Sequence, residues 1–461
     1  MDLMQKIKPG QRAVVIGMGV SGRAMVEFLL SLDVQVFVTD RRNITDLPQA
    51  DRDYLQDNNI PYEGGVHSKE FLCQGDFIVI SPGIPTDLAV LVEMRNKHIP
   101  VLGELALAAP YLSECVVAVT GTNGKTTVTT LIGELLRASG KKVFVGGNIG
   151  TPILNYLLSG EQADVLVLEL SSFQLESAGS FCPHIGVLLN ITPDHLDRHK
   201  TCVNYAAAKM KMFQHQKAND KAITYGDDPL CQQITPLLIS QEVYCFGNQE
   251  SDCAARGVKS EVHITLGDRV EKYTLAGTQL DSHTGLLNSE AAILAVSLLG
   301  CRKEDIQKGL HHFVPARHRM QHVTMRNGVD FYNDSKATNT GAVCSALLSF
   351  SGNIILIAGG RGKGEDYTVL KKLVREKVKT LILIGEAAPL IAEAMAGVVE
   401  IIDAGSMEDA VSIAANSGES GDVVLLAPAC ASFDMFDSYG HRGDLFMEAV
   451  LGLPLEEERA A

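Results

Sequence analysis

Short runs of aliphatic and β-branched residues alternate with helical patterns along almost the whole chain. This alternation is typical of parallel sheets covered by helices. Most of the runs are apolar from end to end, as expected for strands that are buried on both faces. The predicted strands are 13–16, 34–39, 77–81, 116–120, 143–146, 165–170, 185–190, 329–333, 354–358, 380–384, 399–402 and 423–427. The pattern therefore predicts an α/β fold.

The texture of the chain changes between residues 221 and 280, where shorter pieces alternate between apolar and polar positions. Pieces such as 262–266 and 272–275 indicate an antiparallel insert. A length of 461 residues corresponds to about three domains. We place each boundary between a strand-rich block and the next phosphate-type loop, so the expected domains are 1–103, 104–315 and 316–461.

Composition limits the classes of protein that the chain can represent. Hydrophobic residues make up 46% and charged residues 21%, as in an ordinary globular protein. No apolar run approaches the ~18–20 residues of a membrane span, and residues 1–8 lack the apolar core of a signal peptide. Ten cysteines without a C-x-x-C pair indicate buried thiols, not a disulfide or zinc framework, and a cytoplasmic protein. A net charge of −15 argues against nucleic acid or an anionic membrane as the main partner, but not against an anionic small ligand.

A glycine-rich loop, G-M-G-V-S-G at 17–22, follows the first predicted strand and opens a helix, with Asp40 at the end of the next strand. This is the dinucleotide-binding fingerprint, in which glycines let the backbone approach a diphosphate and the acid accepts from a ribose hydroxyl. An NAD-dependent oxidoreductase is the direct interpretation. A tight turn that binds another nucleotide diphosphate, or no ligand, fits the same residues.

A second loop, T-G-T-N-G-K-T-T at 120–127, also lies between a strand and a helix. Its backbone amides and Lys125 can cradle phosphates, and the Thr126 hydroxyl can bind Mg²⁺. Val119 occupies the first glycine position of the strict phosphate-loop motif. The strand–loop–helix context nevertheless predicts an ATP site.

Three candidate site residues follow the central strands. Glu169 ends a predicted strand, where a carboxylate can bind a hard cation or cap a helix. His195 follows another strand, and a lone histidine is more often structural. Lys209, in Y-A-A-A-K, is by itself typical of a surface lysine.

Three polar or glycine-rich loops follow strands in the last third of the chain: N-D-S-K-A-T-N at 333–339, G-G-R-G-K-G at 359–364 and P-A-C-A-S-F-D at 428–434. The glycines and cations of the second loop suit an anion. Turn chemistry explains any one of these loops, but three such strand ends together predict a ligand site.

The combination of these motifs resembles the Mur ligase family. The resemblance runs from residue 14 to 443, and the loop at 17–22 with the segment 432–443 points to the branch that adds D-glutamate. The motifs that carry it are T-G-T-N-G-K-T-T, L-E-L-S-S-F-Q-L-E, T-P-D-H-L-D-R, Y-A-A-A-K, N-D-S-K-A-T-N and A-P-A-C-A-S-F-D.

The resemblance implies Rossmann-like parallel sheets in the N- and C-terminal domains, flanking a central P-loop-type ATPase domain with the antiparallel insert. It implies that the first loop binds a uridine diphosphate sugar through Val20, Ser21, Arg41, Gly83, Asn148 and His195. The ATP-binding residues it implies are Gly121, Thr122, Asn123, Gly124, Lys125, Thr126, Thr127, Asn288, Arg319, Asp334 and Lys336. Those implied for D-glutamate are Thr338, Lys363, Ser432, Phe433 and Tyr439.

The implied reaction is ATP-dependent addition of D-glutamate to UDP-N-acetylmuramoyl-L-alanine through an acyl phosphate, by a cytoplasmic and monomeric enzyme of peptidoglycan synthesis. Its cofactors would be two Mg²⁺ ions and a CO₂-derived carbamate on Lys209. The catalytic residues implied are Lys125, Glu169, His195, Lys209 and Lys336, and the metal ligands Thr126, Glu169, His195 and carbamylated Lys209. The family often has H-N-x-x-N where this chain has 287–291, and Phe where it has Tyr439.

Two other classes remain as alternatives. An NAD-dependent oxidoreductase would leave the loops around Lys125, 334–336 and 429–434 without a role. A nucleotide-gated binding protein would leave the three C-terminal ligand loops unexplained. Within the ligase class, the alternatives are enzymes that add L-alanine, a diamino acid, or poly-γ-glutamate to folate.

Overall fold

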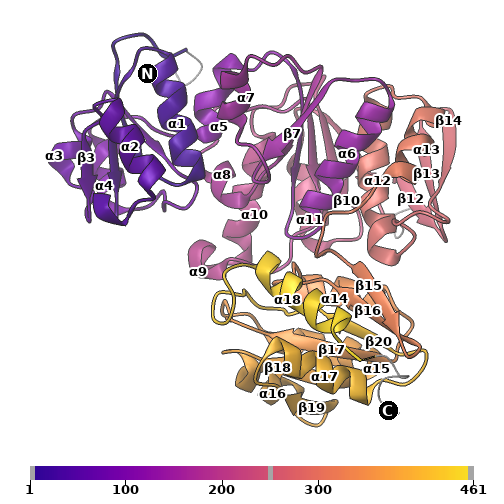
Figure 1. Ribbon diagram of the computed structural model, residues 1–461. Helices are drawn as coiled ribbons and strands as arrows, with labels where there is room; N and C mark the ends of the chain where they lie inside the picture. Colours follow the sequence, from indigo (N-terminus) through magenta and orange to yellow (C-terminus); the bar gives the residue numbers. More distant parts are fainter. Residues whose placement is uncertain (1–5, 248–252, 455–461) are drawn as a thin grey trace.

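The computed structural model describes residues 6–247 and 253–454, so most of the segment 1–8 lies outside the described residues. Three α/β domains follow one another along the chain (Figure 1), and the C-terminal domain lies beside the central one. The predicted strands all form, within a few residues of the expected ends. The predicted α/β fold with three domains is therefore confirmed, while the exact boundaries at 103 and 315 stay predictions.

The N-terminal domain is a five-stranded parallel sheet in the order β3-β2-β1-β4-β5. Two of its edge strands are only three residues long, too short for a sequence pattern to mark. The strands are β1 (Arg12–Ile16), β2 (Gln35–Asp40), β3 (Tyr62–Gly64), β4 (Phe77–Ile80) and β5 (Val101–Gly103). The helices are α1 (Val20–Ser31), α2 (Gln49–Asp57), α3 (Lys69–Leu72) and α4 (Ala89–Asn96).

The central domain has a nine-stranded sheet in the order β14-β13-β12-β11-β10-β9-β6-β8-β7. Its strands are β6 (Cys115–Thr120), β7 (Val143–Gly147), β8 (Val165–Glu169), β9 (Ile185–Leu188), β10 (Lys221–Tyr225), β11 (Glu242–Phe246), β12 (Ala255–Val258), β13 (Glu261–Leu266) and β14 (Arg269–Thr274). Its helices are α5 (Glu104–Ala108), α6 (Lys125–Ala138), α7 (Ile153–Ser159), α8 (Ser172–Glu176), α9 (Leu196–His199), α10 (Cys202–Met210), α11 (Pro229–Ile234), α12 (His283–Leu298) and α13 (Lys303–His312).

The antiparallel insert is smaller than predicted. β10 and β11 pair in parallel with the preceding strands, and β11 also pairs in parallel with β12. Only the β12–β13 and β13–β14 pairs are antiparallel. The prediction of an antiparallel insert, made from the alternating pattern after residue 221, is therefore confirmed for β13 and wrong for β10. β10 is buried within the parallel part of the sheet.

The C-terminal domain has six strands in the order β15-β16-β20-β17-β18-β19, of which β15 is an antiparallel edge strand. Helices α14 and α18 lie on the side that faces the central domain (Figure 1). The strands are β15 (Gln321–Arg326), β16 (Val329–Asn333), β17 (Ile354–Gly359), β18 (Val378–Ile384), β19 (Glu400–Asp403) and β20 (Val423–Leu426). The helices are α14 (Thr340–Leu348), α15 (Lys371–Lys377), α16 (Ala388–Met395), α17 (Met407–Ser417) and α18 (Tyr439–Leu451).

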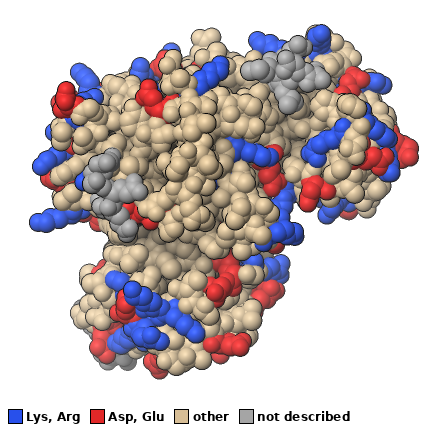
Figure 2. All heavy atoms as spheres, turned by 180° about the vertical axis from the view of Figure 1, so that it is seen from behind, with Lys and Arg blue, Asp and Glu red and all other residues tan. Residues whose placement is uncertain are grey.

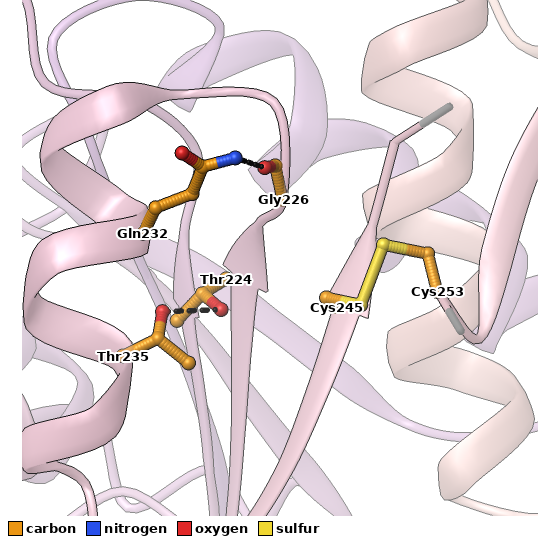
Figure 3. Close-up of a disulfide and its surroundings, with 6 residues drawn as sticks. All are labelled: Thr224, Gly226, Gln232, Thr235, Cys245 and Cys253. Atoms are coloured by element: carbon orange, nitrogen blue, oxygen red, sulfur yellow. Dashed lines mark hydrogen bonds between the residues drawn. A yellow bond between two sulfur atoms is a disulfide. The ribbon is translucent and has the colours of Figure 1, made fainter. Parts of the chain in front are cut away.

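The cysteines differ in part from the prediction of buried thiols. Cys245 at the end of β11 and Cys253 form a disulfide (Figure 3), because the two chain segments run side by side with their Cα atoms 4.8 Å apart. Among the remaining cysteines, Cys231, Cys301 and Cys430 are buried and Cys73 is exposed. The prediction is thus wrong for the disulfide pair and for Cys73.

The surface of the described residues carries both charge signs. On the face shown in Figure 2, Lys and Arg side chains are interspersed with Asp and Glu side chains over the upper body and the C-terminal lobe below it. Within residues 6–247 and 253–454, no helix is both long and apolar enough to cross a membrane.

Candidate active site

A cavity of about 600 Å³ lies between the central and C-terminal domains. The central strands deliver the phosphate loop and Glu169 to it from their carboxyl ends, and C-terminal loops line the other side. Its lining residues are Thr122, Asn123, Gly124, Lys125, Thr126, Asn148, Ile149, Gly150, Glu169, Asp194, His195, Ala316, Arg317, Arg319, Lys336, Thr338, Asn339, Lys363 and Tyr439. Thirteen of the predicted site residues therefore meet in one space.

The phosphate loop wraps around the amino end of α6, where the backbone N–H groups favour an anion. Gly121 and Gly124 have φ of 153° and 85°, values at which a side chain would be strained. The Lys125 ammonium donates to the carbonyls of Gly121 (3.0 Å) and Thr122 (2.7 Å). Burial lowers the pKa of Lys125, although the carboxylates of Glu169 and Asp194 raise it. The cation is thus held at the place where phosphates would bind.

Glu169, at the end of β8, is 2% exposed. Its Oε1 accepts from the Asn148 side chain at 2.8 Å, and its Oε2 is buried without a hydrogen-bond partner. Nearby, the Thr126 hydroxyl accepts from Arg319 at 2.6 Å. A free carboxylate oxygen and a hydroxyl at a phosphate loop are oxygen ligands of the kind that Mg²⁺ prefers, so the residues fit this ion. Among the described residues, no group of three His, Cys, Asp or Glu side chains forms a metal site by itself.

Asp194 is a site residue that the sequence analysis missed. It is 6% exposed, and its carboxylate faces Lys363 (Oδ1–Nζ 3.3 Å) and the adjacent His195 (Oδ2–Nε2 3.7 Å). Burial raises its pKa, but the charges of Lys363, His195 and Lys125 outweigh this and lower it. Its position beside His195 in T-P-D-H-L-D was the available signal.

Lys209 on α10 lies in the interior, so its interpretation as a surface lysine is wrong. It is 1% exposed, its Nζ donates to the Gly121 carbonyl at 2.7 Å, and this Nζ lies 4.4 Å from the centre of the Tyr205 ring. Burial and the nearby charge of Lys125 place the pKa of Lys209 well below its usual value. An uncharged amine is therefore favoured directly behind the phosphate loop.

The C-terminal domain contributes cations to the cavity. Lys336 donates to the Tyr439 hydroxyl at 3.2 Å, a contact that phenylalanine could not make. Asp334, behind Arg319, accepts from the backbone N–H of Met320 at 3.2 Å, and burial raises its pKa to about 6.

Not all predicted residues line this cavity. Ser432 is 2% exposed and accepts backbone hydrogen bonds from the turn that follows it, whereas Phe433 is 65% exposed. Asn288 adjoins the phosphate loop, since a Cβ added at Gly124 would lie 2.6 Å from its Oδ1. Thr127 is buried in the first turn of α6.

The remaining predicted residues, Val20, Ser21, Arg41 and Gly83, gather on the N-terminal domain at the carboxyl ends of β1, β2 and β4. Arg198 of the central domain reaches this edge by donating to the carbonyls of Gly83 (3.4 Å) and Ile84 (3.1 Å).

Asp40 does not present its carboxylate to this edge. Its oxygens accept from the backbone N–H of Met18 (2.7 Å) and from the backbone and guanidinium of Arg42 (2.8–3.1 Å). Burial raises the pKa of Asp40, but these hydrogen bonds lower it to about 2. The Asp40 carboxylate, which is the acid of the dinucleotide fingerprint, is thus occupied by hydrogen bonds from Met18 and Arg42 and is not free to accept one from a ribose.

A phosphate loop, a strand-end glutamate and lysines of a second domain around one cavity define a three-domain α/β protein built to handle a nucleoside triphosphate. Residues 11–103 match the model "Mur ligase MurD-like, N-terminal domain", 119–295 match "Mur ligase middle domain", and 318–430 match "Mur ligase, glutamate ligase domain". The chain belongs to the Mur ligase family.

Individual relatives place it further within the family. It is 50% identical to a UDP-N-acetylmuramoylalanine–D-glutamate ligase of Desulfotalea psychrophila, over 95% of each chain. A protein of the same name from Desulfosudis oleivorans is 41% identical, over 95% of this chain and 96% of its own. The fold is shared with the MurF ligase of Thermotoga maritima in complex with ADP (TM-score 0.61, 19% identity, all of both chains). The MurC ligase of the same organism has a TM-score of 0.56 at 18% identity, over 95% of this chain and 98% of its own.

Proposed function

We propose that this protein is an ATP-dependent ligase that joins D-glutamate to UDP-N-acetylmuramoyl-L-alanine in cytoplasmic peptidoglycan precursor synthesis. The observation that carries the proposal is the convergence of Lys125 and Glu169 with Lys336 and Lys363 of the C-terminal domain in one cavity. The names of the full-length relatives support the choice of substrates.

ATP would bind with its phosphates at the loop 121–127. Lys125 at the loop and Lys336 across the cavity would neutralise the charge that builds up when an anionic carboxylate attacks the γ-phosphate. Arg319 and Asp334 would orient the nucleotide from the C-terminal side, and Asn288 from behind the loop.

Two Mg²⁺ ions would be held by Thr126, Glu169, His195 and a carbamate on Lys209. Bound Mg²⁺ supplies positive charge that stabilises the phosphoryl oxygens. The unpartnered Glu169 oxygen supports one position. Burial lowers the pKa of His195, which favours the neutral ring that can either bind metal or accept a proton.

The reaction would proceed in two steps. The substrate carboxylate attacks the γ-phosphorus, which releases ADP and forms an acyl phosphate. The uncharged amine of D-glutamate then attacks the acyl carbon, phosphate leaves, and the amine gives up one proton. The protein would mainly position the reactants and neutralise charge, because phosphoryl transfer needs little covalent assistance.

The two other ligands would occupy opposite sides of the phosphate loop. The uridine diphosphate sugar would bind at Val20, Ser21, Arg41 and Gly83, with Asn148 reaching it from the central domain. D-glutamate would bind between Thr338, Lys363, Ser432, Phe433 and Tyr439. We propose domains 1–103, 104–315 and 316–461 for the nucleotide sugar, ATP and the amino acid, in a monomer.

The deciding experiment measures phosphate release with ATP, Mg²⁺ and UDP-N-acetylmuramoyl-L-alanine across a panel of amino acids. The proposal requires release that depends on D-glutamate and is matched by formation of the amide product. Equal rates with L-glutamate or L-alanine, or no dependence on any amino acid, would overturn it.

A further inference from the structure

Two side-chain amides meet where the C-terminal domain touches the phosphate loop. Asn123 belongs to that loop, and Asn339 is the N-cap of α14. The Asn123 side-chain N–H donates to Asn339 Oδ1 at 3.2 Å, and the Asn339 N–H donates back to Asn123 Oδ1 at 3.1 Å. The pair therefore joins residues that are 216 positions apart in the chain through two reciprocal hydrogen bonds.

The orientation of this pair is set by its surroundings. Asn339 Oδ1 also accepts from the backbone N–H of Ala342 at 2.8 Å, and its Nδ2 also donates to Asp194 Oδ2 at 3.2 Å. Since a backbone N–H only donates and a carboxylate only accepts, the Asn339 amide cannot be reversed, and this fixes the Asn123 amide in turn.

Asn339 is 3% exposed and links three functional segments. It caps α14, holds the phosphate loop through Asn123, and holds Asp194, whose other oxygen faces Lys363 at 3.3 Å. The approach of the domains is close here, because a Cβ added at Gly341 would lie 2.8 Å from Thr192 Oγ1. The first turn of α14 thus rests directly on the central domain.

We propose that Asn339 and Asn123 form an interdomain clasp that sets the phosphate loop in its working position only when the C-terminal domain is docked. Both are positioning residues for the chemical step. The loop needs such support because Asn123 lies between two glycines of positive φ, where the backbone is readily rearranged. The expected effect of the clasp on the rate of ligation rests on the proposed function.

The clasp should affect the coupled reaction and not ATP binding to the loop. Asn339→Ser keeps a residue type that caps helices but cannot reach Asn123. Asn123→Ala keeps the main-chain hydrogen bonds of the loop to Asn190. We expect each variant to lower kcat/KM for D-glutamate by roughly tenfold, as for the loss of one or two hydrogen bonds. For Asn339→Ser, which leaves the phosphate loop itself unchanged, the Kd of ATP should change less than about twofold. The double variant should be no worse than Asn339→Ser alone, because that substitution already removes both hydrogen bonds between Asn339 and Asn123.

Thr284→Val serves as the matched control. Thr284 on α12 also contacts α14, through Ser345 O (3.2 Å) and the Ser349 hydroxyl (3.3 Å), away from the phosphate loop. Thr284→Val should lower kcat/KM for D-glutamate only slightly. When it is combined with Asn339→Ser, the two fold-changes should multiply. All variants must retain the melting temperature of the parent, so that a general loss of folding is excluded.

Additive losses in the double variant, a loss of ATP affinity in Asn339→Ser equal to its loss of kcat/KM, or full activity of Asn339→Ser would overturn the clasp. Small-angle X-ray scattering of the full chain gives a second measurement without catalysis: Asn339→Ser and Asn123→Ala should increase the radius of gyration, and Thr284→Val should not. Unchanged scattering for all three variants counts against the clasp. If the parent does not ligate D-glutamate, the proposed function fails, and the scattering still decides the clasp.

Discussion

Lys209 provides the sharpest test of the proposed chemistry, because burying a lysine behind a phosphate loop is energetically costly unless the residue has a function there. We predict that its amine reacts with CO₂ to form a carbamate and that Lys209→Ala loses nearly all ligation activity. Carbamate formation needs the uncharged amine. At a reference pKa of ~10.4, roughly one lysine in 1,000 is uncharged at pH 7.4, and each unit by which the pKa falls raises this population about tenfold.

The surroundings of Lys209 in the structure explain why its pKa is lowered. Burial and the charge of Lys125 both lower the pKa of Lys209, and its Nζ donates to the uncharged Gly121 carbonyl at 2.7 Å. Converting the amine into an anion replaces a group that repels Mg²⁺ with an oxygen ligand. Metal-assisted charge stabilisation is worth several kcal/mol, so its loss should lower kcat by at least ~100-fold.

The assay compares Lys209→Ala with the parent, alone and with a short carboxylic acid that can enter the vacated space. Partial recovery with the acid is expected for Lys209→Ala. Lys211→Ala is the matched control, because Lys211 lies two residues further along, is exposed, and donates to the Glu176 carbonyl at 2.7 Å, away from the phosphate loop. It should keep nearly full activity and gain nothing from the acid.

Carbon-13 NMR of the parent in labelled bicarbonate should add a carbamate signal that Lys209→Ala lacks. Folding of the variant is checked by circular dichroism. A folded Lys209→Ala protein as active as the parent, or a parent without the carbamate signal whose activity survives removal of CO₂, would refute the reasoning.

Three further predictions follow from the other sites. Isothermal titration should detect the UDP-muramoyl substrate but no NAD or NADH at millimolar concentration, because Asp40 is bonded to Met18 and Arg42; tight NADH binding would contradict this. Lys363, which faces Asp194, is predicted to bind D-glutamate, so Lys363→Ala should raise the KM for D-glutamate at least tenfold and the KM for ATP much less. A larger rise in the KM for ATP would instead assign Lys363 to the ATP phosphates. Asp40→Asn should cost at most about 2.5 kcal/mol of unfolding free energy at pH 7, measured in urea by circular dichroism. Since the pKa of Asp40 is lowered from 3.8 to about 2 in the folded protein, this difference is full above pH 4 and disappears as the pH falls towards 2, and a constant difference would contradict it.

Local pattern was sufficient wherever the structure depends on neighbours in the chain. Buried strands such as β4 and β17 contain no polar side chain, and this pattern marks them without knowledge of their partners. The phosphate loop is equally local, because its glycines, Lys125 and Thr126 act within one turn. The strand-end position of Glu169 likewise placed it at the ligand edge of the sheet.

Features that depend on partners far along the chain were decided only by the tertiary structure. β10 is short and ambiguous by itself, and its parallel pairing with β9 settles its place in the sheet. Cys245 and Cys253 are only eight positions apart, but their disulfide likewise depends on the folded chain, which brings their Cα atoms to 4.8 Å.

The same distinction applies to the site. Lys209 looks like a surface residue in its own helix, and the packing of α10 against the phosphate loop buries it. Asn339 is predictable as a helix cap, but its bond to Asn123 exists only because two domains meet there. The sequence by itself determined the elements and the chemical groups, since these follow from local periodicity and turn chemistry. Which groups face one another was decided by the folded chain, because burial and interdomain contact depend on residues as far apart as Lys209 and Gly121 (88 positions) or Asn339 and Asn123 (216 positions).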